Sequence, residues 1–222
     1  MLKPRKKLTR KEIKEDPLVT YYVQFQKLLR KYNQQINIGL IAIVVIIAGG
    51  IVLSRSQKGA ERKAASQLAM AEQPFYAQQY DRAILELAPI VDTFSGTKAG
   101  ARAAFFLATA YFEQNDYDKA LTNFEICEKK SSKNLLLKAS SMAGMAACLE
   151  SLGRIDEAAQ MYEKAGKKYG NHFSASQNLL QAARCYSAIN NDTKALELYN
   201  LISSEYPESN EAKDVDFLKA AL

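Results

Sequence analysis

The residues that could carry metal or redox chemistry are few and far apart. The sequence contains three cysteines, Cys127, Cys148 and Cys185, and one histidine, His172. No two cysteines form a CxxC pair, and there is no second histidine to share a metal ion. We therefore expect no zinc site, no disulfide framework and no cofactor.

Catalytic motifs are absent in the same way. The sequence has no GxSxG, no glycine-rich phosphate loop and no HExxH. Its many carboxylates fall on segments predicted to be helical, where they are typical of solvated faces, and His172 is expected at a helix end or on the surface. We expect a protein that is not an enzyme and has no small-molecule substrate.

The net charge of +6 belongs to the N-terminal part of the chain. Residues 1–37 hold ten Lys/Arg and three Asp/Glu, a net +7, and the remaining residues hold twenty against twenty-one, a net −1. A uniformly basic patch for nucleic acid is therefore not indicated, and no nucleic-acid partner is expected. Residues 1–16 predict a basic tail that stays in the cytoplasm.

The longest apolar stretch is residues 36–53, INIGLIAIVVIIAGGIVL, which has no charged residue. At about 1.5 Å per helical residue, eighteen residues reach about 27 Å, close to the thickness of a bilayer's hydrocarbon core. Residues 36–54 are thus predicted to form a single transmembrane helix. A cleaved signal peptide is disfavoured because Ile51, Val52 and Leu53 continue the apolar stretch past the small residues.

Residues 17–35 predict an amphipathic helix just before the span. Asp16-Pro17 is typical of a helix start, and apolar residues follow at spacings of four and three. We expect this helix in the lipid headgroup region, with membrane lipid as its partner; the alternative is a partner helix. The expected interfacial residues are Tyr21, Tyr22, Phe25, Lys27, Arg30, Lys31 and Tyr32.

The charges beside the span give a mixed signal for orientation. Lys27, Arg30 and Lys31 precede it, whereas Arg55, Lys58, Arg62 and Lys63 follow it. The short N-terminal part nevertheless carries ten basic residues, which are unfavourable to translocate. We predict a single-pass inner-membrane protein with its N-terminus in the cytoplasm and its C-terminal domain in the periplasm. Three unpaired cysteines argue mildly against this orientation.

Residues 55–222 contain a repeat with a period of about 37 residues. The segments YDRAILEL, YDKALTNF, IDEAAQMY and DTKALELY align on Ala83, Ala120, Ala158 and Ala195. A second helical stretch precedes each segment, and in the last three units it carries a small residue followed three places later by a bulky one. These pairs are Ala108 with Tyr111, Ala146 with Leu149, and Ala183 with Tyr186.

This pattern resembles the tetratricopeptide repeat (TPR) family, in which small residues let two antiparallel helices pack closely. The resemblance predicts an all-α fold: an N-terminal transmembrane helix, then an α-solenoid of about four helical hairpins and a C-terminal capping helix. The predicted repeats are residues 64–97, 101–132, 139–170 and 176–207, with the cap at 208–222.

The first repeat is the least regular. Pro74 occupies the place of the bulky residue, so its first helix is expected to kink or to end early. That helix would continue from the span, either unbroken or with a break near Gly49-Gly50. Cys148 and Cys185 share one register in successive repeats, which indicates small buried packing residues.

The inner face of the solenoid is expected to bind peptides, on a wall made by the first helix of each hairpin. Phe105 and Phe112 lie seven residues apart on one stripe and could grip an apolar peptide side chain. The alternative is that either of them packs as core against a neighbouring repeat. The candidate binding residues are Arg102, Phe105, Thr109, Phe112, Glu113, Glu150, Gln177, Gln181 and Arg184.

The order of basic N-terminal segment, interfacial helix, span and TPR domain resembles the ancillary subunit of the SecYEG translocon, the YfgM-like family. The resemblance implies a periplasmic scaffold near the translocon exit. Its partners would be translocon subunits, a membrane-anchored chaperone or unfolded clients.

Three alternatives remain open from the sequence. One is a scaffold for cell-envelope assembly or division, similar to periplasmic Tol-associated coordinators. Another is an N-anchored receptor with cytosolic repeats, similar to mitochondrial import receptors, which would suit the reduced cysteines. The third is a structural subunit of a membrane complex.

Overall fold

The computed structural model describes residues 17–170 and 174–222. These residues form α-helices and the turns that join them, with no strand in the described part of the chain. The predicted fold class, an apolar N-terminal helix followed by stacked hairpins and a last helix, is confirmed. The predicted tail at residues 1–16 and His172 lie outside the described residues. Contacts divide the chain into two units, Met1–Ser56 and Gln57–Leu222.

The first unit contains α2 (Pro17–Lys31) and the beginning of α3 (Asn33–Tyr76). The helix predicted over residues 17–35 is therefore too long at its end, because α2 stops before a turn at Tyr32 and Asn33 opens α3. Asparagine competes with helical hydrogen bonding inside a helix and favours helix ends, which accounts for the break at this point.

α3 contains a segment that is long and apolar enough to cross a membrane. Its side chains from Ile41 to Leu53 are all exposed, so nothing within the described protein covers them. The helix continues without a break through Gly49 and Gly50. A glycine costs a helix only about 1 kcal/mol relative to alanine, which is too little to interrupt so long an apolar segment.

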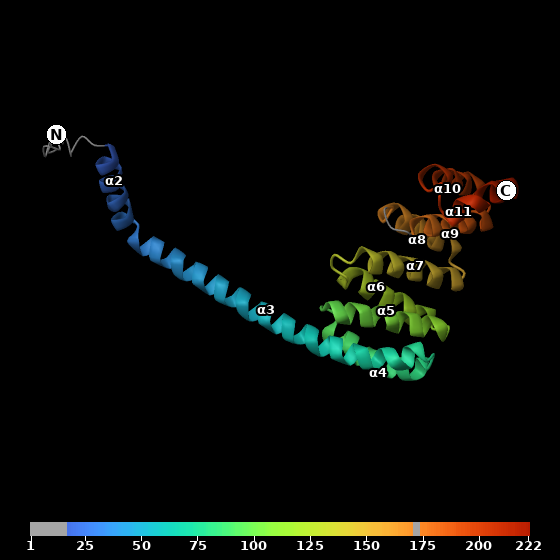
Figure 1. Ribbon diagram of the computed structural model, residues 1–222, viewed down its shortest axis with the longest axis horizontal. Coiled ribbons are helices and arrows are strands. Elements are labelled where there is room, and N and C mark those ends of the chain that lie inside the picture. Colours follow the sequence, from blue (N-terminus) through green and yellow to red (C-terminus); the bar gives the residue numbers. More distant parts are fainter. Residues whose placement is uncertain (1–16, 171–173) are drawn as a thin grey trace, which may run out of the picture. The chain divides into compact units, whose positions relative to one another are not determined.

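The second unit is a stack of four helical hairpins (Figure 1). In each hairpin we call the two members the first helix and the second helix. The hairpins pair the end of α3 with α4 (Tyr80–Phe94), α5 (Lys98–Glu113) with α6 (Tyr117–Lys130), α7 (Leu135–Ser151) with α8 (Ile155–Lys168), and α9 (Ala175–Ala188) with α10 (Asp192–Glu205). The last helix, α11 (Asn210–Ala220), buries Val215 in the core shared with α9 and α10.

One residue in the left-handed backbone region reverses the chain inside each hairpin. These residues are Gln78, Asn115, Gly153 and Asn190, with φ of 57°, 62°, 75° and 59°. The next residue then donates its backbone N–H to a carbonyl five positions earlier, as in a Schellman helix end. The four bonds are Gln79 to Pro74 at 2.9 Å, Asp116 to Tyr111 at 2.9 Å, Arg154 to Leu149 at 2.9 Å and Asn191 to Tyr186 at 2.8 Å.

Pro74 does not end the first helix early, contrary to the sequence prediction. α3 continues for two residues beyond it, to Tyr76. Proline lacks an N–H but keeps its carbonyl, and the carbonyl is the group that the turn requires from this position. The first hairpin therefore closes with the same turn as the other three.

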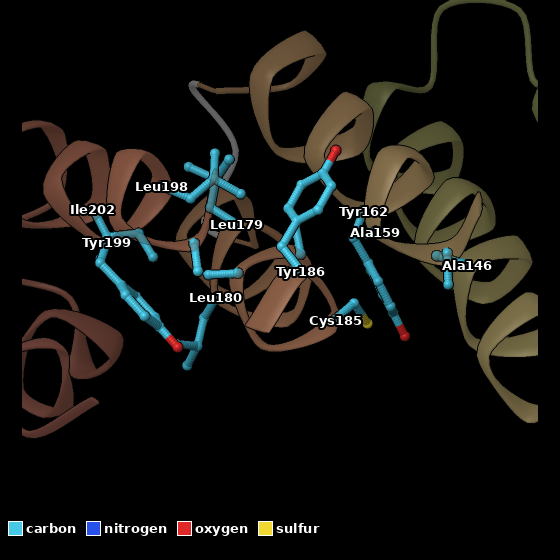
Figure 2. Packing of buried hydrophobic residues seen from close by; sticks show 14 of the residues in the cluster. Ala146, Ala159, Tyr162, Leu179, Leu180, Cys185, Tyr186, Leu198, Tyr199 and Ile202 are labelled. Atoms are coloured by element: carbon cyan, nitrogen blue, oxygen red, sulfur yellow. The ribbon is translucent and has the colours of Figure 1, made fainter. Parts of the chain in front are cut away.

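Alanines of the repeat pattern sit at the closest helix contacts. Ala83, Ala120, Ala158 and Ala195 have no exposed surface, and neither do Ala108, Ala146 and Ala183. Ala71, at the matching place in α3, is 1% exposed. The large residues four places after the second-helix alanines fill the adjoining space, as Figure 2 shows for Tyr162 and Tyr199.

Gly100 allows the second hairpin to join the first. A Cβ at this position would lie 1.8 Å from the Phe94 carbonyl oxygen, which belongs to the backbone and cannot rotate away. Thr97 caps the same helix start by accepting a hydrogen bond from the Gly100 N–H at 2.9 Å. The tight passage from α4 to α5 thus requires glycine.

A charged network joins the last two hairpins. Glu163 on α8 accepts hydrogen bonds from Lys167 at 2.6 Å and from the Tyr186 hydroxyl on α9 at 2.7 Å. Burial by itself raises the pKa of Glu163, but the hydrogen bonds from Lys167 and Tyr186 outweigh it, and the pKa lies below its ordinary value of 4.5.

Replacing Gly100 with alanine is expected to lower the free energy of unfolding by about 1–3 kcal/mol, because the added Cβ forces the α4–α5 connection apart. Gly96→Ala is the matched control, since a Cβ there has no neighbour within 4 Å. Thermal unfolding of the full chain in detergent compares the two. Equal melting temperatures for the two variants would contradict the close approach.

The lowered pKa of Glu163 makes the last two hairpins acid-sensitive. Because the folded pKa lies below the unfolded one, this contribution to stability is present above about pH 4.5 and is lost as the pH falls through the folded value. Glu163→Gln should cost about 1–2 kcal/mol at pH 7 and less at pH 3, which is below the unfolded pKa. Glu125→Gln, which breaks an exposed pair with Lys129, should cost almost nothing at either pH. Urea unfolding at both pH values tests this, and a pH-independent loss for Glu163→Gln would refute it.

Candidate functional site

A groove lies on the first helices of three successive hairpins. It encloses about 620 Å³ between α3, α5, the α6–α7 loop and the start of α7. We call it the first-helix groove. Its floor is small and apolar, and its rim is charged. The floor residues are Ala65, Leu68, Ala69, Ala99, Ala101 and Leu137, the charged rim residues are Glu61, Glu72, Lys98, Arg102 and Lys133, and the polar residues Ser131, Ser132 and Asn134 complete the lining.

Two contacts of α3 hold the groove in shape. The Glu61 carboxylate accepts hydrogen bonds from the backbone N–H groups of Lys98 at 2.7 Å and Ala99 at 3.1 Å. It thereby caps α5 from a different helix, where a negative charge is favourable. Arg102 donates to Glu72 across the groove at 2.9 Å. The wall formed by α3 is thus fixed to the wall formed by α5.

Of the residues predicted to bind peptide, only Arg102 lines this groove. Thr109 donates its hydroxyl to the Phe105 carbonyl of its own helix at 3.0 Å, and Glu113 is exposed at the end of α5. Glu150 is exposed at the end of α7, and its carboxylate lies 3.4 Å from the Tyr162 hydroxyl. On α9, Gln177 and Arg184 are exposed and Gln181 is half-buried, none of them at the groove.

The two phenylalanines singled out from the sequence have different surroundings. Phe105 is half-buried between two core clusters, and its ring centroid lies 5.6 Å from that of Phe124 and 6.2 Å from that of Phe106. Phe112 is also half-buried, but it packs against one core cluster, and its ring centroid lies 5.3 Å from that of Tyr117. Phe105 therefore takes part in the packing between hairpins, which was the alternative left open by its spacing.

The sequence analysis missed the contribution of α3. Ala65, Leu68 and Glu72 precede Arg102, Phe105 and Thr109 by one repeat length of 37 residues, so the same register would have found them. The first repeat is the least regular in sequence because of Pro74, and none of its residues is among the predicted binding residues. The structure shows that its first helix carries one full wall of the groove.

A second, shallower groove of about 400 Å³ lies between α6, α7 and α8. Met142, Met145 and Met161 line it together with Leu121 and Leu149. Methionine side chains adapt to differently shaped apolar partners. Met142, Met145 and Leu149 are, however, at most 7% exposed, so most of this lining belongs to the core.

The residues predicted at the membrane interface lie on α2 and the turn that follows it. Tyr21, Tyr22 and Phe25 are 70%, 61% and 59% exposed, so no described part of the protein covers this face. Tyr22 accepts a hydrogen bond from Gln26 at 2.8 Å, and the Lys31 ammonium lies 5.4 Å from the centre of the Tyr32 ring. Lys27 and Arg30 are exposed on the same helix.

The three thiols are packing groups. Cys127 and Cys148 have no exposed surface and Cys185 is 4% exposed. Burial raises the pKa of the Cys148 thiol to about 12 and that of Cys185 to about 11, and it also raises the pKa of Cys127. A buried, protonated thiol is a poor nucleophile and is slow to oxidise.

Comparison with known families agrees with this architecture. The family described as "Tetratricopeptide repeat-like domain" matches residues 26–177, which is more than half of the chain. The chain belongs to this family. A second family model, described as "Tetratricopeptide repeat", matches residues 177–209 in the fourth hairpin. The first match also covers the apolar segment of α3, so the family joins that segment to the repeats.

Solved structures share the fold at low sequence identity. The nearly identical TPR-like repeats of a candidate kinesin light chain from Podosopora anserina match at 20% identity, with a TM-score of 0.55, over 82% of this chain and 92% of that one. Apo RapI matches at 19% identity with a TM-score of 0.61, over 95% of this chain but only 62% of RapI. No curated protein matches by sequence. These likenesses concern the fold alone.

The different surroundings of Phe105 and Phe112 predict different mutational effects. Phe105→Ala should lower the free energy of unfolding by about 2–4 kcal/mol, because it removes a ring shared by two core clusters. Phe112→Ala should lower it by about 1 kcal/mol or less. Denaturant unfolding of the full chain measures both, and a larger loss for Phe112→Ala would contradict the core role of Phe105.

Proposed function

We propose that this protein is a membrane-anchored scaffold that holds segments of other polypeptides in the first-helix groove. The observation that carries the proposal is the composition of α3. The same helix contains an apolar segment long enough to cross a membrane and also forms one wall of the groove. TPR domains in general mediate contacts between proteins, and the groove has the small apolar floor and charged rim that suit an extended chain.

We further propose that the repeat domain lies in the periplasm at the exit of the Sec translocon. The resemblance to the ancillary translocon subunit supports it, as does the excess of basic residues before the apolar segment. In this setting the groove would receive emerging polypeptides beside translocon subunits and a membrane-anchored chaperone. Catalysis, nucleic acid and small-molecule substrates have no part in the proposal.

The three unpaired cysteines are only a weak argument against a periplasmic location. All three are buried, and their pKa values are raised. Thiols of this kind do not pair or oxidise readily while the protein is folded. A receptor with cytosolic repeats remains the second candidate, because three reduced cysteines are ordinary in the cytosol.

The exposed aromatic face of α2 supports a role for lipid in holding the protein. Tyrosines at the water–lipid boundary keep their rings in the apolar region and their hydroxyls wet, and lysine and arginine reach the phosphates. α2 would then lie along the headgroup layer on the cytoplasmic side of the span. A partner helix is the competing occupant of this face.

Topology and crosslinking together test the proposed function. Protease added to spheroplasts should digest residues 54–222 if the domain is periplasmic. A photo-crosslinking amino acid at Ala69, on the groove floor, should then capture translocating polypeptides at least about fivefold more than the same group at Thr122, an exposed position on α6.

Each half of the experiment can fail by itself. Protection of residues 54–222 in spheroplasts with intact inner membranes would exclude the periplasmic location and favour the cytosolic receptor. Equal capture at Ala69 and Thr122 would exclude the groove as the binding surface, whatever the topology.

A further inference from the structure

The ends of the stacked helices form two edges with opposite charge. Because the hairpins stack in parallel, all first helices begin at one edge and end at the other (Figure 1). In the first three hairpins the edge where first helices begin and second helices end carries ten basic and three acidic side chains, a net +7. We call it the basic edge. Its basic residues are Lys58, Arg62, Lys63, Lys98, Lys129, Lys130, Lys133, Lys138, Lys167 and Lys168, and its acidic residues are Glu61, Asp92 and Glu128.

The opposite edge, where first helices end and second helices begin, carries three basic and seven acidic side chains, a net −4. We call it the acidic edge. The basic residues are Arg82, Lys119 and Arg154, and the acidic residues are Asp81, Glu113, Asp116, Asp118, Glu150, Asp156 and Glu157. The stack is therefore electrically polarised along its helix axes.

The helix dipole accounts for the second helices. Acidic residues in the first turn and basic residues in the last turn each stabilise a helix by about 0.3–1 kcal/mol. α8 follows this rule with Asp156 and Glu157 at its start and Lys167 and Lys168 at its end, and α6 follows it as well. These charges need no ligand to explain them.

The first helices break the same rule. α5 begins with Lys98, α7 has Lys138 in its first turn, and neither helix has an acidic residue there. A positive charge at a helix start is unfavourable to the helix. Lys58, Arg62 and Lys63 are exposed on the side of α3 that faces away from its core residues Ala64, Leu68 and Ala71. The helix dipole therefore does not explain the basic residues on first helices.

We propose that the basic edge binds the anionic phospholipid headgroups of the membrane that anchors the chain. The proposal rests on the proposed anchoring by α3. Glu61, which caps α5 at this edge, lies eight positions after Leu53, the last apolar residue of the span. Even fully extended, this stretch reaches only about 28 Å, so the Glu61 end of the basic edge is tethered to the span within that distance.

The chemistry of the edge suits a lipid surface. Lysines predominate, and a lysine ammonium acts as a point charge that meets phosphates in many geometries. Each basic residue near an anionic membrane contributes about 1 kcal/mol, and the contribution falls off within a Debye length of about 8 Å. Lys98, Lys130 and Lys133 are exposed and form no ion pair within the described residues. The acidic edge would then face away from the membrane.

Fluorescence energy transfer on the full-length chain in vesicles tests the proposal. The native thiols are buried, so Gly96→Cys places a dye at the basic edge and Ser151→Cys places one at the acidic edge. The acceptor is a labelled lipid headgroup. Vesicles contain phosphatidylcholine alone or with about one third phosphatidylglycerol. Lys98→Gln/Lys130→Gln/Lys133→Gln is the test variant, and Arg82→Gln/Arg154→Gln/Arg184→Gln removes the same charge elsewhere.

We expect more energy transfer from position 96 in anionic than in neutral vesicles, and no such difference at position 151. Salt at about 0.5 M should abolish the difference, because it screens charges at the surface. The lysine variant should lower the ratio of docked to undocked domain about a hundredfold, and the arginine variant should leave it unchanged. Energy transfer from position 96 that does not depend on lipid charge, or that is unaltered in the lysine variant, overturns the proposal. An edge that binds an acidic protein instead of lipid would give the first of these results.

Flotation separates this proposal from the anchoring on which it rests. A chain that floats with neutral vesicles in high salt is anchored, and the transfer measurement then decides the role of the edge. If the chain floats only with anionic vesicles at low salt, and the lysine variant does not float, the result supports lipid binding by the basic edge and refutes the membrane anchor. A chain that floats with neither refutes both.

Discussion

The structure depends on one backbone turn that is used four times. In each hairpin a residue in the left-handed region lets the next N–H reach the carbonyl five positions back, and this closes the first helix and starts the second. This turn brings the two helices of a hairpin together, and the alanines of the repeat pattern are then fully buried where the helices pack. Helix length, register and the period of about 37 residues all follow from where this turn falls.

The same turn makes the end of α3 the first helix of the first hairpin. Gln78 adopts the left-handed conformation although Pro74 precedes it, and α3 becomes the first helix of the stack. An apolar segment of spanning length is thereby continuous with a wall of the groove. Glu61 and Glu72 then fix that wall to α5 through a helix cap and an ion pair. One helix thus contains both a segment of spanning length and a wall of the groove.

The parallel arrangement also organises charge. Second helices place acidic residues at one edge and basic residues at the other because every helix start favours negative charge. The lysines at the starts of α5 and α7 oppose that preference. We assign these lysines to an interaction with a partner outside the described protein. They belong to the basic edge, which is the edge nearer to the apolar segment along the chain.

Most of the fold could be predicted from the sequence because it depends on periodic features. The alanines at 83, 120, 158 and 195 marked the second helices directly. The left-handed positions were harder to recognise, since they are Gln, Asn, Gly and Asn, and only the glycine signals its conformation by type. The break between α2 and α3 falls just before Asn33, and Pro74, which predicted a kink or an early end, occupies the last turn of α3.

The groove was predicted less well, for a physical reason. Register gives the side of a helix that faces outward, but it does not say which neighbouring helices complete a concavity. Arg102 lines the groove, whereas the ring of Phe105 packs against those of Phe124 and Phe106.

Residue-resolved hydrogen exchange on the full chain in detergent tests the central claim, that one turn builds all four hairpins and makes α3 a member of the stack. The amides of Gln79, Asp116, Arg154 and Asn191 donate the four equivalent bonds. The account predicts that all four exchange at least about a hundredfold more slowly than in a free peptide. Unprotected exchange at Gln79, with the other three amides protected, would show that α3 is not the first helix of a repeat and would contradict the account.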